Sequence, residues 1–187
     1  MLAISIGMGV SVLHAPHQPH DHDHDDDGNC SSRSDRDSTI QDLNETFSVF
    51  RNFGVQFRFP ADWTLSKQTK EDETTITVES DGTSFWTLML FDARPDPDSV
   101  LDTAVEAFKD IYDDIDVVST ITSVCGLPAL GQDIDFVCYD LVNSAILRVF
   151  QTAERTVMVM YQGTDHELKS TRDLLETMTS SLQCDDE

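Results

Sequence analysis

Residues 54–63 contain the clearest hydrophobic pattern in the chain. Residues 55–59 alternate between apolar and polar side chains, Val-Gln-Phe-Arg-Phe, which is the period of a half-buried strand. Pro60 has no amide hydrogen to donate to a sheet, so it ends the strand. Trp63 follows as a large apolar anchor just beyond the turn. The pattern predicts an opening strand, a proline stop and a buried anchor.

Further strand patterns lie on both sides of this segment. Residues 47–49 predict a short strand that leads into it, although a helix over 39–50 is the competing interpretation, because apolar residues recur there at helical spacing. Residues 73–79 alternate, and Asp81-Gly82 is typical of a hairpin. Residues 85–91 are apolar on both faces, so we expect a central strand that is covered on two sides.

Two amphipathic helices are predicted. The first covers about 99–114, after a proline-rich break and with Asp98 or Ser99 as its cap. The second covers about 165–182, where Thr164 and Glu167 have the spacing of a capping box. Both carry an apolar stripe at helical spacing, so each should bury one side.

Four more strands are predicted between these helices, over about 117–125, 129–141, 144–152 and 155–162. The connections at Asn143-Ser144 and Glu154-Arg155 are short, and short connections make neighbouring strands antiparallel. An antiparallel sheet with apolar residues on both faces needs cover on both faces. The predicted fold class is therefore α+β, with an antiparallel β-sheet flanked by helices on both faces in a three-layer α/β/α sandwich.

This pattern resembles the PsbP-like superfamily, which includes PsbP, Mog and DcrB-like proteins. The resemblance is carried by residues 54–63, Gly-Val-Gln-Phe-Arg-Phe-Pro-Ala-Asp-Trp, by the turn at 125–129, Cys-Gly-Leu-Pro-Ala, by the meander over 129–162 and by the capped last helix. It covers about residues 46–183. The resemblance implies an antiparallel sheet between helices. It also implies a protein that, like most members of the superfamily, lacks enzymatic activity and binds other proteins as an assembly factor or chaperone. It supplies no catalytic motif.

Three segments follow from this division. Residues 1–45 hold an apolar N-terminal end and a His/Asp-rich tail with little that could pack. Residues 46–183 form the predicted PsbP-like domain, and residues 184–187 form an acidic C-terminal tail.

The charge of the chain disfavours several classes of partner. The sequence has 35 acidic and 12 basic residues, for a net charge of −23, and residues 38–187 alone hold 28 acidic and ten basic residues. Nucleic acid and anionic membranes are disfavoured, because binding them needs a footprint of Lys and Arg. Two interpretations remain: a solvated surface that aids solubility or suits high salt, and steering of the chain toward a basic partner or cations.

The four cysteines do not predict an obvious disulfide. If Gly126 to Pro128 forms a turn, Cys138 lies about 30 Å from Cys125 along the hairpin, far beyond disulfide range. We expect Cys138 to be a buried thiol, because it shares a strand face with apolar residues. A bond between Cys30 and Cys184 stays open, and zinc-ribbon spacing is absent from the sequence.

Residues 3–13 are apolar but too few to span a bilayer, so we expect no integral membrane segment. They resemble the hydrophobic part of a signal peptide, yet Ala15 before Pro16 makes a poor cleavage site. A clipped signal peptide within residues 1–15 and a plain apolar end are both compatible with this pattern. Cytoplasmic and exported locations therefore both stay open.

The tail supplies the one candidate metal site. Imidazole and carboxylate groups together suit Zn²⁺, Ni²⁺ or Cu²⁺, and a flexible chain that must be ordered would bind them weakly. The alternative interpretation is a solvated tail whose metal affinity has no functional role. The candidate ligands are His14, His17, His20, His22, His24, Asp21, Asp23 and Asp25.

Two functions follow from these patterns. The first is a non-catalytic protein-binding, assembly or chaperone-type domain of unknown partner, possibly a basic one, with no cofactor. The second is an exported metal-binding protein that uses the His/Asp tail. An enzyme is the weakest hypothesis, because the sequence contains no nucleophile elbow, P-loop or dinucleotide fingerprint. Asp113, Asp114 and Asp116 are interpreted as the solvated end of a helix or as an exposed recognition patch.

Overall fold

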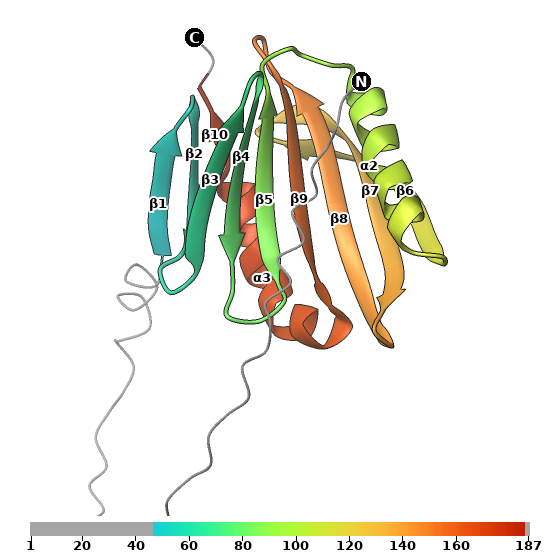
Figure 1. The fold of residues 1–187 in the computed structure, drawn as a ribbon. Coiled ribbons are helices and arrows are strands. Elements are labelled where there is room, and N and C mark those ends of the chain that lie inside the picture. Colours follow the sequence, from blue (N-terminus) through green and yellow to red (C-terminus); the bar gives the residue numbers. More distant parts are fainter. Residues whose placement is uncertain (1–46, 186–187) are drawn as a thin grey trace, which may run out of the picture.

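The computed structural model describes residues 47–185, which form two antiparallel sheets and two helices (Figure 1). The helices are α2 (Pro97–Ile111) and α3 (Asp165–Ser181). The strands are β1 (Phe47–Asn52), β2 (Val55–Pro60), β3 (Thr64–Lys70), β4 (Glu73–Glu79), β5 (Phe85–Phe91), β6 (Ile115–Val124), β7 (Leu127–Cys138), β8 (Leu141–Gln151), β9 (Thr156–Thr164) and β10 (Gln183–Cys184).

The larger sheet has seven strands in the order β3-β4-β5-β9-β8-β7-β6. Each neighbouring pair is antiparallel, so the predicted meander over the last four strands is confirmed. The chain leaves the centre of the sheet after β5, runs through α2 and re-enters at β6, the far edge. This crossover places β3 at one edge of the sheet and β6 at the other (Figure 1).

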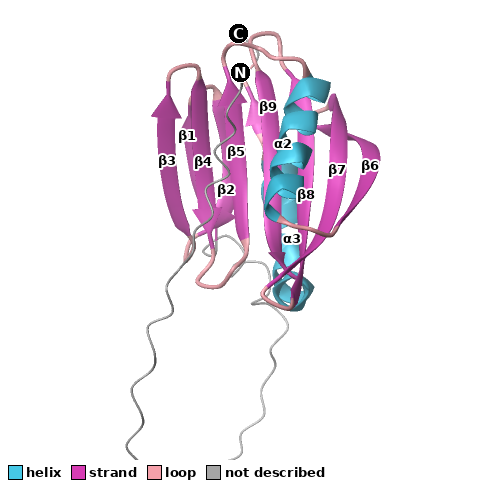
Figure 2. Ribbon diagram, turned by 45° about the vertical axis from the view of Figure 1, so that its right-hand side comes forward, coloured by secondary structure: helices cyan, strands magenta, loops and turns pink. Residues whose placement is uncertain are grey.

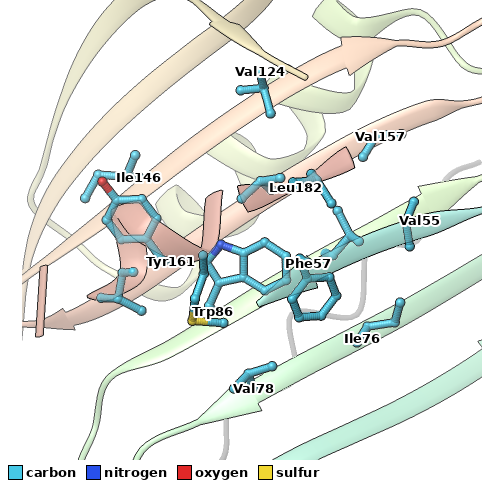
Figure 3. Close-up of a cluster of buried hydrophobic side chains, with 14 of the residues drawn as sticks. Val55, Phe57, Ile76, Val78, Trp86, Val124, Ile146, Val157, Tyr161 and Leu182 are labelled. Carbon is cyan, nitrogen blue, oxygen red and sulfur yellow. The ribbon is translucent and has the colours of Figure 1, made fainter. Parts of the chain in front are cut away.

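The opening strand is confirmed as β2, but it belongs to a second, three-stranded sheet with the order β1-β2-β10. Its inward residue Phe57 is fully buried and lies between two rings, 5.1 Å from Phe50 and 4.7 Å from Trp86. Figure 3 shows Phe57 beside the Trp86 indole of β5. The indole nitrogen donates a hydrogen bond of 2.9 Å to Thr179 in α3. These contacts attach the small sheet to one face of the large one.

The structure confirms the α+β class with antiparallel sheets, but the helices do not clearly flank both faces. On one face, α3 shares the cover with the small sheet, and their apolar residues form one core with Trp86 and its neighbours. On the opposite face, α2 packs with a separate core, and its main contacts are with β7 and β8. A complete three-layer sandwich therefore does not form, because α2 runs along the β7–β8 side of the sheet and no described helix covers β3 and β4 on that face (Figure 2).

Two strands and two turns differ from the sequence predictions. The turn predicted at Gly126 to Pro128 lies at Cys125-Gly126, because Leu127 of β7 already pairs with Val124 of β6. Residues 64–70 form β3, which was not predicted because its Thr-Leu-Ser-Lys-Gln-Thr-Lys sequence is polar and mostly exposed. β10 is only two residues long and depends on pairing with β2. The predicted turn at Asn143-Ser144 is wrong: both residues lie within β8, and the chain turns at Tyr139 and Asp140, which both have positive φ.

The helix termini lie within three residues of their predicted positions. Pro97 opens α2 at its first position, with Asp96 as the N-cap. The predicted cap of α3 is confirmed, because the Thr164 hydroxyl accepts a bond of 3.3 Å from the Glu167 amide. The Glu167 carboxylate does not complete a capping box. It accepts hydrogen bonds from Thr83 and Ser84 in the β4–β5 loop instead.

Candidate functional site

β6 is the most exposed long strand of the large sheet. It pairs with β7 on one side only, over ten residues, and no other described element pairs with its outer side (Figure 2). Half of its backbone hydrogen-bonding groups therefore point away from the sheet. A strand of this kind is a template on which another extended chain can pair.

The sequence of β6 accounts for both its conformation and its exposure. Ile-Asp-Val-Val-Ser-Thr-Ile-Thr-Ser-Val is rich in β-branched residues, which favour strands. The tight turn at Cys125 and Gly126, both with positive φ, then joins it to β7. Ile121 is 85% exposed and Val118 is 61% exposed. Large apolar side chains at an edge are unusual, because natural edges are normally protected by charge, proline or distortion.

Two carboxylates oppose each other at the start of this edge. Asp116 of β6 is the direct cross-strand partner of Asp135 of β7, so both side chains lie on the same face of the sheet. Like charges in this position are destabilising. Within residues 47–185, none of the ion pairs found includes either aspartate. The pair is thus a small anionic site with no basic side chain bonded to it in the described chain.

The arginine of the neighbouring strand β8 is already engaged. Arg148 of β8 forms an ion pair of 2.6 Å with Asp133 and donates a second bond of 2.8 Å to the carbonyl of Leu147. Asp135 accepts a hydrogen bond of 2.6 Å from the Ser144 hydroxyl. This bond fixes the position of the carboxylate without neutralising its charge.

Exposed apolar residues extend the same face toward the β7–β8 turn. Val137 and Val142 are cross-strand partners, with exposures of 54% and 46%. The strand register places them on the same face as Asp116, Val118 and Asp135. We call these five residues the edge patch. It combines an unpaired strand edge, apolar side chains and negative charge.

Other parts of the described chain offer weaker candidates. The uncovered face over β3, β4 and β5 contains a depression of about 150 Å³, which is smaller than the ~300–1,000 Å³ of typical ligand pockets. Hydroxyl and charged side chains line it together with Phe85, Met89 and Met160. A pocket of this size and polarity gives no clear indication of a substrate.

Few described side chains have a shifted pKa, and they lie in separate elements. Burial raises the pKa of Tyr112, with a further contribution from Cys138. Burial also raises the pKa of Tyr161, with Glu176 as the next cause. For Glu167, burial acts to raise the pKa, but hydrogen bonds from Thr83 and Ser84 outweigh it, so the pKa is lowered. These groups do not form one cluster of acids and bases.

The predicted metal ligands, from His14 to Asp25, lie outside the described residues. Within residues 47–185, no three His, Cys, Asp or Glu side chains are placed to hold a metal ion. His166, the remaining histidine of the sequence, is exposed in the first turn of α3. Neither helix in the described part of the chain has the length and apolar character needed to cross a membrane.

Sequence reasoning found one part of the edge patch and missed the rest. Asp113 and Asp114 do follow α2, but Asp116 lies inside β6 rather than at the end of a helix. The pairing of Asp116 with Asp135 depends on the β6–β7 register, which the turn at Cys125-Gly126 sets. The sequence analysis placed this turn at Gly126 to Pro128, and counting outward from there pairs Asp116 with Cys138 instead of Asp135. The acidic pair was therefore missed because the predicted register was wrong by three residues.

Comparison with solved structures identifies the fold. Cyanobacterial PsbP (CyanoP) from Synechocystis sp. PCC 6803 matches with a TM-score of 0.56 and 10% identity, over 74% of this chain and 92% of that chain. LpqN, involved in cell envelope biogenesis of Mycobacterium tuberculosis, matches with a TM-score of 0.45 and 12% identity, over 80% of this chain and 98% of that chain. No family model and no curated protein matches the sequence. The chain has a PsbP-like fold, as its sequence predicted.

Proposed function

We propose that this chain, which has a PsbP-like fold, is a non-catalytic protein-binding domain that takes an extended, basic segment of a partner protein along β6. The observation that carries this proposal is the edge patch. Its exposed strand edge, its apolar side chains and its opposed pair of aspartates lie side by side on one face.

Each part of the patch has a complementary feature in the proposed partner. The outward amide and carbonyl groups of β6 pair with the backbone of an added strand, which provides affinity without sequence preference. Val118 and Val137 contact apolar side chains that alternate along that strand. A Lys or Arg of the partner lies between Asp116 and Asp135 and relieves their repulsion. The net charge of −23 adds long-range attraction for a basic partner.

A fluorescently labelled peptide of alternating lysine and valine is a direct probe of this proposal. We expect saturable binding, measured by fluorescence anisotropy, that weakens about tenfold in the Asp116→Asn, Asp135→Asn double variant. The matched control is Glu71→Gln with Asp72→Asn, which removes the same charge from the exposed β3–β4 turn. Equal weakening in both variants would mean that net charge alone attracts the peptide, and it would contradict the proposed site.

A second copy of the chain is the main rival occupant, because β3 is itself a polar strand with two lysines. Sedimentation of the chain alone distinguishes the two cases. A monomer that binds the peptide supports a separate partner. Concentration-dependent association that the Asp116→Asn, Asp135→Asn variant abolishes would assign the edge to self-assembly instead.

We also propose, as a second function, that the His/Asp tail binds a divalent transition metal in an exported form of the protein. The supporting observation is that five of the six histidines fall within residues 14–24, beside Asp21 and Asp23. Calorimetric titration of the full chain with Zn²⁺ tests this. We expect heat of binding near neutral pH, lost when the five histidines are replaced by serine and weakened as pH falls and the imidazoles protonate. Absence of binding heat at high micromolar Zn²⁺ would overturn it.

A further inference from the structure

We propose that Cys125 and Cys184 form an intramolecular disulfide under oxidising conditions, and that this bond joins the C-terminal strand of the chain to the large sheet. This disulfide would be separate from the proposed binding function, because neither cysteine belongs to the edge patch.

The two cysteines are 59 positions apart in the sequence, yet their side chains are in contact. The Sγ atoms of Cys125 and Cys184 lie 3.3 Å apart, and the thiol of Cys125 also lies 3.2 Å from the carbonyl oxygen of Leu182. The sulfurs must approach by only about 1.3 Å to reach the roughly 2.05 Å length of a disulfide. A movement of this size is within the reach of side-chain rotation.

The surroundings allow a small oxidant to reach the pair. Both cysteines are half-buried, and they lie in a surface depression that is also lined by Ser123, Gly126 and Gln183. Cys125 is in the β6–β7 turn with φ of 53°, so its position is set by the turn geometry. Cys184 is fixed by its pairing with Val55 in β2.

The bond would strengthen the weakest attachment in the small sheet. β10 contributes only two residues, paired with Gln56 and Val55, and the next amide, of Asp185, donates a bond of 2.9 Å to Gly54. A covalent link to the β6–β7 turn would hold this strand in place when its few hydrogen bonds open. It would also close a long loop, and long loops gain the most from cross-linking in the chain-entropy model.

The other described cysteine cannot compete for either partner. Cys138 packs with the core on the α2 face, whereas Cys125 and Cys184 pack with the core on the α3 face. The large sheet therefore separates Cys138 from the pair. Cys30, which lies outside the described residues, is the remaining rival, as the sequence had left open.

The chemistry is thiol–disulfide exchange with a small-molecule disulfide such as oxidised glutathione. One cysteine thiolate attacks a glutathione sulfur, forms a mixed disulfide and releases one glutathione as its thiolate. The second cysteine thiolate then attacks the protein sulfur of that mixed disulfide and releases the second glutathione. The protein loses two electrons and two thiol protons, and two molecules of reduced glutathione carry them away. Such a bond persists in an oxidising compartment and is reduced in the cytosol.

Peptide mapping of the full chain tests the proposal. Trypsin places Cys125 and Cys138 in one peptide, residues 110–148, and Cys184 in another, residues 173–187. The Cys138→Ser variant therefore leaves Cys125 as the only cysteine of its peptide. After treatment with oxidised glutathione at pH 8 and alkylation, we expect the two peptides to be linked, with a mass about 2 Da below their sum. The melting temperature should rise by the order of 10 °C on oxidation, and Cys184→Ser should abolish the rise.

Two outcomes would overturn the proposal. One is recovery of both peptides unlinked and alkylated after complete oxidation. The other is a link from residues 173–187 to residues 1–33, which contain Cys30. If Cys138→Ser does not fold, the wild-type chain is mapped instead, with fragment ions used to separate Cys125 from Cys138. The measurement detects a covalent bond, so its result does not depend on whether a peptide binds at the edge patch.

Discussion

The two edges of the seven-stranded sheet are built from opposite kinds of residue. β3 is a polar strand with Lys67 and Lys70, and six of its seven residues are polar and exposed to solvent. The ammonium of Lys67 lies 5.7 Å from the ring centre of Phe53, in the β1–β2 turn. β6 has no lysine, and it exposes Val118 and Ile121.

The difference indicates which edge is available for pairing. Lysines and a neighbouring turn protect β3 in the way that natural edge strands are usually protected. β6 lacks these devices, although its like-charged neighbours, Asp116 and Asp135, would repel an acidic strand. Under the proposed function, β6 is a selective edge rather than an unprotected one, and the following predictions test that contrast.

The largest expected effect is on the β3 side of the large sheet, where Phe57 of the small sheet packs against Trp86 of β5. Phe57→Ala removes a fully buried ring that contacts Trp86 and Phe50. It should lower the free energy of unfolding by about 3–5 kcal/mol, measured by urea denaturation, because it leaves a cavity between the two sheets. Val118→Ala at the exposed β6 edge is the control and should change this free energy by less than about 0.5 kcal/mol. Comparable losses in the two variants would show that β6 is structurally buried.

A smaller effect is expected when β6 is given the protection that β3 already has. Val118→Lys places an ammonium group in the edge patch, on the same face as Asp116 and opposite Asp133, where it should repel a basic strand. We expect the lysine–valine peptide to bind about tenfold more weakly, a change of about 1.4 kcal/mol, with the melting temperature almost unchanged. Ser66→Lys adds the same charge to β3 and should leave peptide binding intact. A loss in Ser66→Lys that equals the loss in Val118→Lys would remove the distinction between the two edges.

The smallest effect concerns the loop between β4 and β5, two strands on the β3 side of the large sheet. Glu167→Gln weakens the bonds that Thr83 and Ser84 donate to the carboxylate. After allowance for solvent screening, the free energy of unfolding at pH 7 should fall by about 0.5–1 kcal/mol. Asp165→Asn is the matched control, because it removes the same charge from the first turn of α3 without touching this loop.

The effect of Glu167 should depend on pH in a defined direction. Its pKa in the folded state is lowered below the ordinary value of 4.5, so the folded state favours the charged form. The stabilisation is therefore complete above about pH 4.5 and is lost as pH falls through the lower folded value. Urea denaturation at pH 7 and at pH 3 should show the difference between Glu167→Gln and Asp165→Asn shrinking in acid. A difference that stays constant with pH would mean that the carboxylate charge is not what matters.

Local sequence patterns predicted most of the elements. The alternation of apolar and polar residues predicted β2, β4 and the strands of the meander, and the Thr164 cap predicted the start of α3. Both signals depend only on residues that are neighbours in the sequence. β3 was missed since its residues carry no apolar face, and it is a strand only because β4 supplies hydrogen-bonding partners. The turn at Asn143-Ser144 was misplaced for a related reason. Two polar residues there suggested a loop, but tertiary contacts keep both in β8 and bury them to less than a tenth exposed.

The candidate site was less predictable than the fold. The acidity of residues 113–116 and the apolar character of β6 were visible in the sequence. Neither property indicated that β6 would be an edge, because strand order depends on the crossover through α2. The proximity of Cys125 to Cys184 could not be predicted either, since β10 has no pattern of its own and meets the β6–β7 turn only after both sheets have packed.

The sequence by itself determined the α+β class, the PsbP-like order of elements and the negative charge of the chain. Periodicity, turn residues and composition are local or additive, so they need no knowledge of what lies across the sheet. Only the tertiary structure decided that the opening strand joins a separate sheet, that Asp116 opposes Asp135 and that two distant cysteines touch. These features arise from contacts between residues far apart in the chain, whose register is set by the packing of whole elements.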